Sequence, residues 1–168
     1  MSMLRIGHGY DAHRLVPGRR MILGGVDVPH HLGLDGHSDA DVLTHAVMDA
    51  LLGALSLGDI GLHFPPGDAA FAGADSIKLL QKVVGMIKEQ GFSLCNLDAT
   101  IIAQKPKLAG HIPKMRENLA AAIGVPVGLC SVKATTEEGM GFTGREEGVA
   151  AHCVLLLAKE NRENKRPV

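Results

Sequence analysis

The chain has 168 residues, of which 46% are hydrophobic and 21% are charged, and its formal net charge is −1. This length fits one globular domain, and the balanced charge provides no basic footprint for nucleic acid. Aromatic residues make up only 3% of the chain, too few for a module that stacks single-stranded bases, whereas nine histidines favour metal binding and proton transfer.

The cysteines and the apolar runs indicate the cellular compartment of the protein and whether it contacts a membrane. Its three cysteines, Cys95, Cys130 and Cys153, are far apart and odd in number, so neither a disulfide framework nor a thiolate zinc site is expected. The N-terminus lacks the pattern of a signal peptide, and no apolar run is long enough to span a membrane. We therefore expect a cytoplasmic protein without a membrane partner.

The first third of the chain predicts a strand, a hairpin and a helix. A strand is expected at residues 3–9, followed by a hairpin of residues 20–23 and 26–28 and then a polar, histidine-rich loop. Ser38, with Asp41 three residues later, resembles a capping box. Apolar residues at helical spacing follow, and Gly58 ends the predicted helix.

The rest of the chain alternates helices and strands. Residues 59–74 contain a Pro-Pro-Gly sequence and are predicted as a loop, and a helix follows from Asp75 or Ser76 to Gly91. The remaining predicted elements are a strand at 94–103, a turn at 106–110, a helix ending at Gly124, a strand at 129–136, a glycine-rich loop at 137–148 and a strand at 149–158.

This order, hairpin-α-β-α-β-α-β, predicts an α/β (α+β) fold with a mixed four-stranded sheet and helices on one face. The other face would be aliphatic, so we expect copies of the chain to pack through their sheet faces. We predict a single catalytic domain over residues 1–159 and a polar, disordered tail over residues 160–168.

Two groups of residues are candidate metal ligands. In an extended segment Asp11 and His13 point to the same side, either as ligands or as a carboxylate that merely orients a surface histidine. Asp41, His45 and Asp49 share one helix face, which is most often a solvated polar face. His45 lies among apolar residues, however, and two histidines with one carboxylate and an open position are typical of catalytic zinc.

Three further segments suit anions. His37 and Ser38 lie at a predicted helix start, where exposed N–H groups bind anions, although Ser38 could simply cap the helix. Lysines and hydroxyls at 105–107 and 133–136 follow predicted strand ends and suit phosphates, with Glu138 placed to hold a second cation, but surface charge explains them equally well. Arg145 lies in a glycine-rich segment that is either an anion clamp or a flexible turn.

Five short motifs occur together in one order: Gly7-His8-Gly9-Tyr10-Asp11-Ala12-His13, His37-Ser38-Asp39-Ala40-Asp41-Val42, Gly58-Asp59-Ile60-Gly61, Lys133-Ala134-Thr135-Thr136 and Gly141-Phe142-Thr143-Gly144-Arg145. Together they resemble the 2-C-methyl-D-erythritol 2,4-cyclodiphosphate synthase family of the non-mevalonate isoprenoid pathway, over roughly residues 3–159.

The resemblance implies a homotrimer with active sites between adjacent subunits. It implies zinc on Asp11, His13 and His45, and Mg²⁺ or Mn²⁺ held by Glu138 through substrate phosphates. The implied substrate is 4-diphosphocytidyl-2-C-methyl-D-erythritol 2-phosphate, whose 2-phosphate attacks its own β-phosphorus to give the cyclodiphosphate and CMP. Such a reaction needs no protein nucleophile, because phosphoryl transfer is governed by positioning and charge neutralisation.

The resemblance also assigns roles along the chain. The implied catalytic residues are His37, Ser38, Thr136 and Glu138. The implied substrate-binding residues are Asp11, His13, His37, Ser38, Asp59, Gly61, Asp68, Ala103, Lys107, Ala134, Thr135, Thr136, Phe142 and Arg145. Within that set, segments 103–107 and 134–136 would form a cytidine and phosphate pocket on the neighbouring subunit, and Phe142 and Arg145 would face an isoprenoid diphosphate at the trimer axis.

Two positions depart from the family pattern. Pro66 stands where some members carry an acid, and Glu146 stands where glycine is frequent, which would place a negative charge beside an anion at the axis. Three alternatives to a cyclase are a metal-dependent phosphoesterase acting on a nucleoside diphosphate conjugate, a small-molecule binding protein and a purely structural trimer. Reaction products and metal content separate them.

Overall fold

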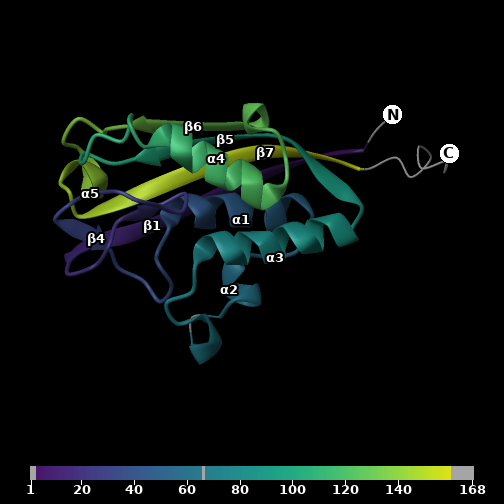
Figure 1. Cartoon of the computed structure of the whole chain (residues 1–168), viewed down its shortest axis with the longest axis horizontal. Coiled ribbons are helices and arrows are strands. Elements are labelled where there is room, and N and C mark those ends of the chain that lie inside the picture. The colour runs from purple at the N-terminus through teal and green to yellow at the C-terminus, as the bar shows by residue number, and fades with distance from the viewer. Residues whose placement is uncertain (1–2, 66, 160–168) are drawn as a thin grey trace.

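A computed structural model describes residues 3–65 and 67–159 (Figure 1). The tail predicted at 160–168 and the departure at Pro66 lie outside the described residues. The buried apolar side chains of this part form one continuous core beneath the sheet, which is mostly aliphatic and includes Phe92. Within it, no helix combines the length and the apolarity that crossing a membrane requires.

The main sheet has five strands in the order β4-β1-β7-β5-β6. Its strands are β1 (Leu4–Pro17), β4 (Leu32–Leu34), β5 (Phe92–Ile102), β6 (Cys130–Thr135) and β7 (Gly148–Lys159). β5 and β6 are parallel, and the other neighbours are antiparallel. The mixed sheet is therefore as predicted, but the prediction of four strands is wrong.

The extra strand results from the length of β1. The sequence predicts a strand that ends at Gly9, but β1 stays paired with β7 as far as Arg14, opposite Gly148. Its last residues then pair with β4, which lies in the segment predicted as loop. β4 has only three residues, too few to show alternation, so its pairing depends on the neighbouring strand rather than on its own pattern.

The helices lie on one side of the sheet, as predicted (Figure 1). The long ones are α1 (Val42–Ala54), α3 (Ser76–Glu89) and α4 (Ile112–Ile123), and the short hairpin of β2 (Ile22–Leu23) and β3 (Val26–Asp27) is also as predicted. Burial alternates along the strands: Gly7, Gly9 and Cys153 are buried, whereas His8 and His152 are exposed on the opposite face. One sheet face is therefore left uncovered by the helices of this chain.

Two glycines let α1 lie directly on β1. A Cβ atom at Gly7 would be 1.9 Å from the carbonyl oxygen of Ala50, and one at Gly9 would be 1.9 Å from that of Ala46. No side chain fits at either position, so the helix backbone rests against the strand. This close contact brings the first turns of α1 beside the end of β1 that carries Asp11 and His13.

The start of α1 differs from the predicted capping box. Asp41, not Ser38, is the N-cap, because Ala40 adopts a φ of +57° and interrupts any helix begun at Ser38. The fully buried Asp41 carboxylate accepts hydrogen bonds from the N–H groups of Thr44, Gly24 and Gly25 at 2.8–3.0 Å. One side chain thus caps the helix and fixes the β2–β3 hairpin against it.

Two predicted loops contain short helical turns. Segment 59–74 holds α2 (Ile60–His63) and the 3₁₀ turn η1 (Ala69–Phe71), and segment 137–148 holds α5 (Gly141–Gly144). A further 3₁₀ turn, η2 (Val127–Leu129), precedes β6. The Asp49 carboxylate accepts the N–H of Ile60 at 2.8 Å, so α1 sets the position at which α2 begins.

Candidate metal centre and substrate cavities

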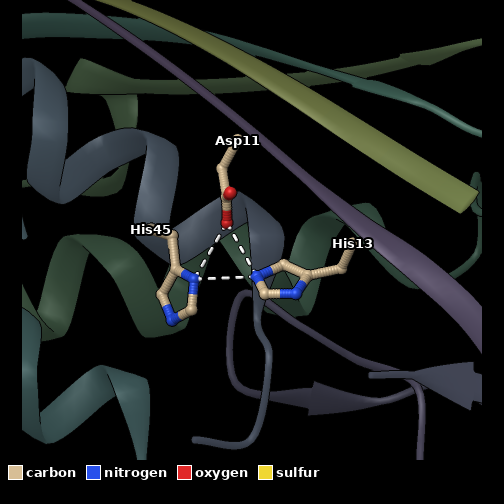
Figure 2. Close-up of side chains that lie close together, drawn as sticks. All are labelled: Asp11, His13 and His45. Carbon is tan, nitrogen blue, oxygen red and sulfur yellow. Dashed lines mark hydrogen bonds and ion pairs between the residues drawn. The ribbon is translucent and has the colours of Figure 1, made fainter. Parts of the chain in front are cut away.

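Asp11, His13 and His45 direct one atom each toward a common point (Figure 2). Asp11 Oδ2 lies 2.9 Å from both His13 Nε2 and His45 Nδ1, and the two nitrogens are 3.2 Å apart. β1 supplies the first two residues and α1 supplies the third. Two imidazole nitrogens and one carboxylate oxygen within this distance could hold a metal ion and leave a coordination position open.

A hydrogen bond to the backbone fixes the orientation of the His13 ring. Its Nδ1 lies 2.6 Å from the carbonyl oxygen of Asp35, which accepts the Nδ1–H and leaves the Nε2 lone pair directed at Asp11 and His45. Asp11 is oriented in the same way, because its Oδ1 accepts the N–H of Ala12 at 2.8 Å. Contacts within the protein therefore orient both candidate ligand atoms.

Asp11 and His13 each shift the pKa of the other. Burial acts to raise the pKa of the Asp11 carboxyl, but its hydrogen bonds with His13 and His45 outweigh burial and hold that pKa well below its usual range. Burial acts to lower the pKa of His13, but the Asp11 carboxylate and the Asp35 carbonyl outweigh it and raise that pKa above its ordinary value. Asp11 is consequently ionised at neutral pH and available as a ligand.

The three residues open into a cavity of about 230 Å³. The predicted residues His37, Ser38 and Gly61 line the same cavity. Its remaining walls are apolar, formed by Met48, Ile60, Phe64, Phe71 and Leu79. The arrangement suits a small ligand with an anionic group near the three-residue cluster and a carbon skeleton against the apolar wall.

Several predicted residues lie beside this cavity without lining it. Asp59 is the N-cap of α2, and its Oδ1 accepts the N–H of Leu62 at 3.0 Å. The carbonyl oxygen of Asp68 lies 3.3 Å from His37 Nε2. Asp41 is the N-cap of α1 and Asp49 lies one turn after His45, but their carboxylates hold backbone N–H groups and do not join the cluster.

A second cavity of about 270 Å³ gathers another predicted set. Ala103 and Lys107, which follow β5, line it together with Ala134, Thr135 and Thr136 at the end of β6. It shares no lining residue with the first cavity. The parallel pairing of β5 and β6 brings the two segments together, because both strands end at the same edge of the sheet.

The segment after β6 carries the remaining candidates. Thr136 Oγ1 donates to Glu138 Oε1 at 2.7 Å. Phe142 lines a third cavity of about 410 Å³ together with His13 and Arg14. The guanidinium of Arg145 is paired with Glu147 at 2.8 Å, and this contact raises the pKa of Arg145 and lowers that of Glu147.

Glu146, the second departure from the family pattern, is paired with Lys105 at 2.9 Å. Its φ of +59° lies in the left-handed region that glycine adopts most easily, which gives a backbone reason for glycine at this position. The Glu146 carboxylate thus pairs with Lys105, while the Arg145 guanidinium pairs with Glu147.

The apolar wall of the first cavity and the residues that contact His45 Nε2 were not predicted from the sequence. Phe64 and Phe71 lie in a segment predicted as loop, and no periodicity marked them as neighbours. Ser76 and Asp39 contact each other and reach His45 Nε2 through Ser76. From the sequence, Ser76 was expected only as a candidate helix cap, and Asp39 was noted only within the motif of residues 37–42.

The fold and the cluster define an α/β protein with a candidate metal site beside a cavity that suits a small molecule. A sequence model of the YgbB family matches residues 4–158, and the chain belongs to that family.

The chain is 66% identical over 154 residues to the 2-C-methyl-D-erythritol 2,4-cyclodiphosphate synthase of Trichlorobacter lovleyi, covering 92% of this chain and 98% of that protein. It is 62% identical over 160 residues to the synthase of the same name from Synechocystis, covering 95% and 99%. A solved structure of such a synthase, in a form with bound CDP, superposes with a TM-score of 0.84 at 35% identity, covering 91% of this chain and 99% of that one.

Proposed function

We propose that the chain converts 4-diphosphocytidyl-2-C-methyl-D-erythritol 2-phosphate into 2-C-methyl-D-erythritol 2,4-cyclodiphosphate and CMP. The observation that carries this proposal is the convergence of Asp11, His13 and His45 in a chain 66% identical to a synthase of that name. The CDP bound to a relative at 35% identity supports a cytidine nucleotide as part of the substrate.

The donor set fits zinc as the ion at the cluster. Two imidazole nitrogens and one carboxylate oxygen are borderline-hard ligands, and the cavity lies on the side where a fourth ligand would enter. Glu138, oriented by Thr136, would hold Mg²⁺ or Mn²⁺ through the substrate phosphates. When bound, these ions supply charge neutralisation for the phosphate oxygens.

In the first cavity, His37 and Ser38 would hold the 2-phosphate. Gly61, which lines the cavity, and Asp59 at the start of the same short helix would bind the erythritol hydroxyls. Asp68, whose carbonyl oxygen lies near His37, completes the substrate-binding residues on this side. The apolar wall would pack the methyl-erythritol carbons and exclude water.

The second cavity would take the cytidine and its phosphates. Because its lining residues and those of the first cavity form two separate sets, one substrate would join the cavities of adjacent copies. We therefore propose a homotrimer in which Ala103–Lys107 and Ala134–Thr136 of one copy complete the site of the next. Backbone groups and aliphatic walls would hold the pyrimidine, since none of these residues is aromatic.

The reaction itself requires positioning more than covalent help. An oxygen of the 2-phosphate forms a bond to the β-phosphorus, and the bond from that phosphorus to the CMP oxygen breaks. Residues on both sides would hold the two ends in line, so the attack is intramolecular. The dry apolar wall would disfavour water as the competing nucleophile.

Phe142 and Arg145 would face an isoprenoid diphosphate at the trimer axis, with the diphosphate replacing Glu147 as the partner of Arg145. We also propose that the enzyme works in the cytoplasm.

The test is to incubate the purified chain with the substrate, zinc and Mg²⁺ and to follow products by ³¹P NMR. Cyclodiphosphate and CMP in equal amounts are expected. CMP with an open-chain phosphate would instead indicate the phosphoesterase alternative, in which water attacks phosphorus. No turnover by a zinc-loaded trimer would leave the binding-protein alternative.

A further inference from the structure

The nitrogen of His45 that points away from the metal position has its own partners. While Nδ1 faces Asp11, Nε2 lies 3.0 Å from Ser76 Oγ and 3.3 Å from Ser38 Oγ. Ser76 is the first residue of α3 and is fully buried, so water does not compete for this contact. His45 therefore spans α1 and α3 as well as the metal position.

The Ser76 hydroxyl is in turn committed to Asp39. Its proton is donated to Asp39 Oδ1 at 2.5 Å, and the backbone N–H of Ser76 is donated to Asp39 Oδ2 at 3.0 Å. A hydroxyl has a single proton and two lone pairs. Because that proton lies toward Asp39, the hydroxyl presents a lone pair to His45 and accepts a hydrogen bond from Nε2–H.

We propose that Ser76 and Asp39 are positioning residues that hold His45 with its proton on Nε2 and its lone pair on Nδ1, directed at the metal. The inference rests on the proposed metal site. It makes His45 the counterpart of His13, whose Nδ1–H is held by the Asp35 carbonyl. Partners of this kind fix the tautomer and ring orientation of a ligand and increase its basicity.

If Ser76 and Asp39 had a purely structural role, removal of the Ser76 hydroxyl would leave zinc affinity unchanged. Asp39 also ties its loop to the segment before α3, because its N–H donates to the carbonyl of Ala74 at 3.1 Å. Ser76→Ala separates the two roles. It deletes only the hydroxyl, while the backbone N–H at position 76 still reaches Asp39 Oδ2.

The first measurement is zinc affinity of metal-stripped trimer by competition with a chromophoric chelator. Ser76→Ala is expected to weaken zinc binding by about 10- to 100-fold. Ser76→Thr, which keeps the hydroxyl, should restore it. Thr44→Val is the matched control: it deletes another buried hydroxyl, which donates to Asp41 Oδ2 at 2.7 Å, and should leave zinc affinity unchanged.

The second measurement uses the unaltered protein and so does not depend on a variant folding. With Co²⁺ in place of zinc, the exchangeable N–H protons of metal-bound histidines give shifted NMR signals. We expect two slowly exchanging signals, one from His13 Nδ1–H and one from His45 Nε2–H, and loss of the second in Ser76→Ala.

The outcomes separate this inference from the proposed function. If the wild-type chain takes up no zinc, the metal site and the positioning role both fall. If it takes up zinc and Ser76→Ala binds zinc equally well, or keeps both slow signals, the positioning role alone is wrong.

Discussion

His13 reaches the metal position with both ring nitrogens in use, one on Asp35 and one toward Asp11 and His45. His13→Ala leaves two ligands, which rarely hold zinc on their own, so we expect zinc content to fall well below one ion per chain. Elemental analysis of purified protein measures this. His152→Ala, on the opposite sheet face, should keep its zinc, and stoichiometric zinc in His13→Ala would contradict the ligand assignment.

Glu138 offers a test of the second ion independent of the first. Its carboxylate accepts a hydrogen bond from the Thr136 hydroxyl and lies outside the cluster of Asp11, His13 and His45. We expect Glu138→Ala to raise the Mg²⁺ concentration needed for half-maximal turnover while zinc content stays unchanged. An Mg²⁺ titration that coincides with that of the wild type would exclude this role.

The three cysteines differ in how readily they react. Burial raises the pKa of the Cys153 thiol to about 12 and raises that of Cys130, whereas Cys95 is only half-buried. Since the thiolate is the nucleophile, folded protein at about pH 8 should react with iodoacetamide at Cys95 alone. Mass spectrometry of the native protein should show one adduct; modification of Cys153 without unfolding would contradict the buried assignment.

At the scale of elements, the contact of α1 with β1 depends on Gly9. An added Cβ would lie 1.9 Å from the Ala46 carbonyl oxygen, so α1 must move away and take His45 with it. We expect Gly9→Ala to destabilise the fold by about 3 kcal/mol and to lower zinc affinity. Thermal unfolding and chelator competition measure the two effects.

Gly85 supplies the control for that substitution. It lies inside α3, and a Cβ there would meet nothing within 4 Å. Gly85→Ala should therefore stabilise the protein by about 0.5–1 kcal/mol, because alanine loses less backbone entropy than glycine in a helix. Equal losses of stability in both variants would show that the α1–β1 contact is not the cause.

Elements with a local signal, such as apolar periodicity or turn glycines, could be predicted from sequence, whereas elements held in place by a neighbouring element could not. The apolar spacing of α1 and the glycines of the β2–β3 hairpin determine those elements locally. β4, α2 and α5 have three or four residues each, and they form because a neighbouring element holds them. The N-cap of α1 was misplaced for the same reason, since the partners of Asp41 include a hairpin distant in sequence.

Some residues of the candidate site could likewise be predicted from sequence, and others could not. Asp11 and His13 are two apart on one strand, so spacing alone predicted that they share a side. His45 joined them by residue type, and the structure brings the three together. Ser76 and the aromatic wall reach the cavity only through tertiary packing, for which a single sequence contains no pattern.

At the scale of the whole molecule, the uncovered sheet face divides into two halves. On β1 and β7 it exposes the large apolar residues Leu4, Ile6, Tyr10 and Val154, together with His8 and His152. On β5 and β6 it carries polar groups, including the ion pair of Asp98 with Lys133. Adjacent exposed apolar side chains on one face are typical of an interface, and the charged half would limit how neighbouring copies align.

Ile6 is the residue on which the trimer proposal can be tested. Its side chain is 72% exposed in the isolated chain, so a charge there costs the monomer little. In a trimer packed through these faces the same charge would be buried without a partner, which is strongly unfavourable. We expect Ile6→Asp to fold as a monomer and to lose turnover, because the nucleotide cavity of a neighbour would be missing.

Sedimentation velocity measures the assembly, and circular dichroism checks that the variant is folded. Val127→Asp, an exposed apolar residue in the η2 turn, is the control and should remain trimeric. A trimeric Ile6→Asp would show that another surface joins the copies. A folded monomer that kept full turnover would mean that one chain contains the whole site, against the two separate cavities from which the shared site is inferred.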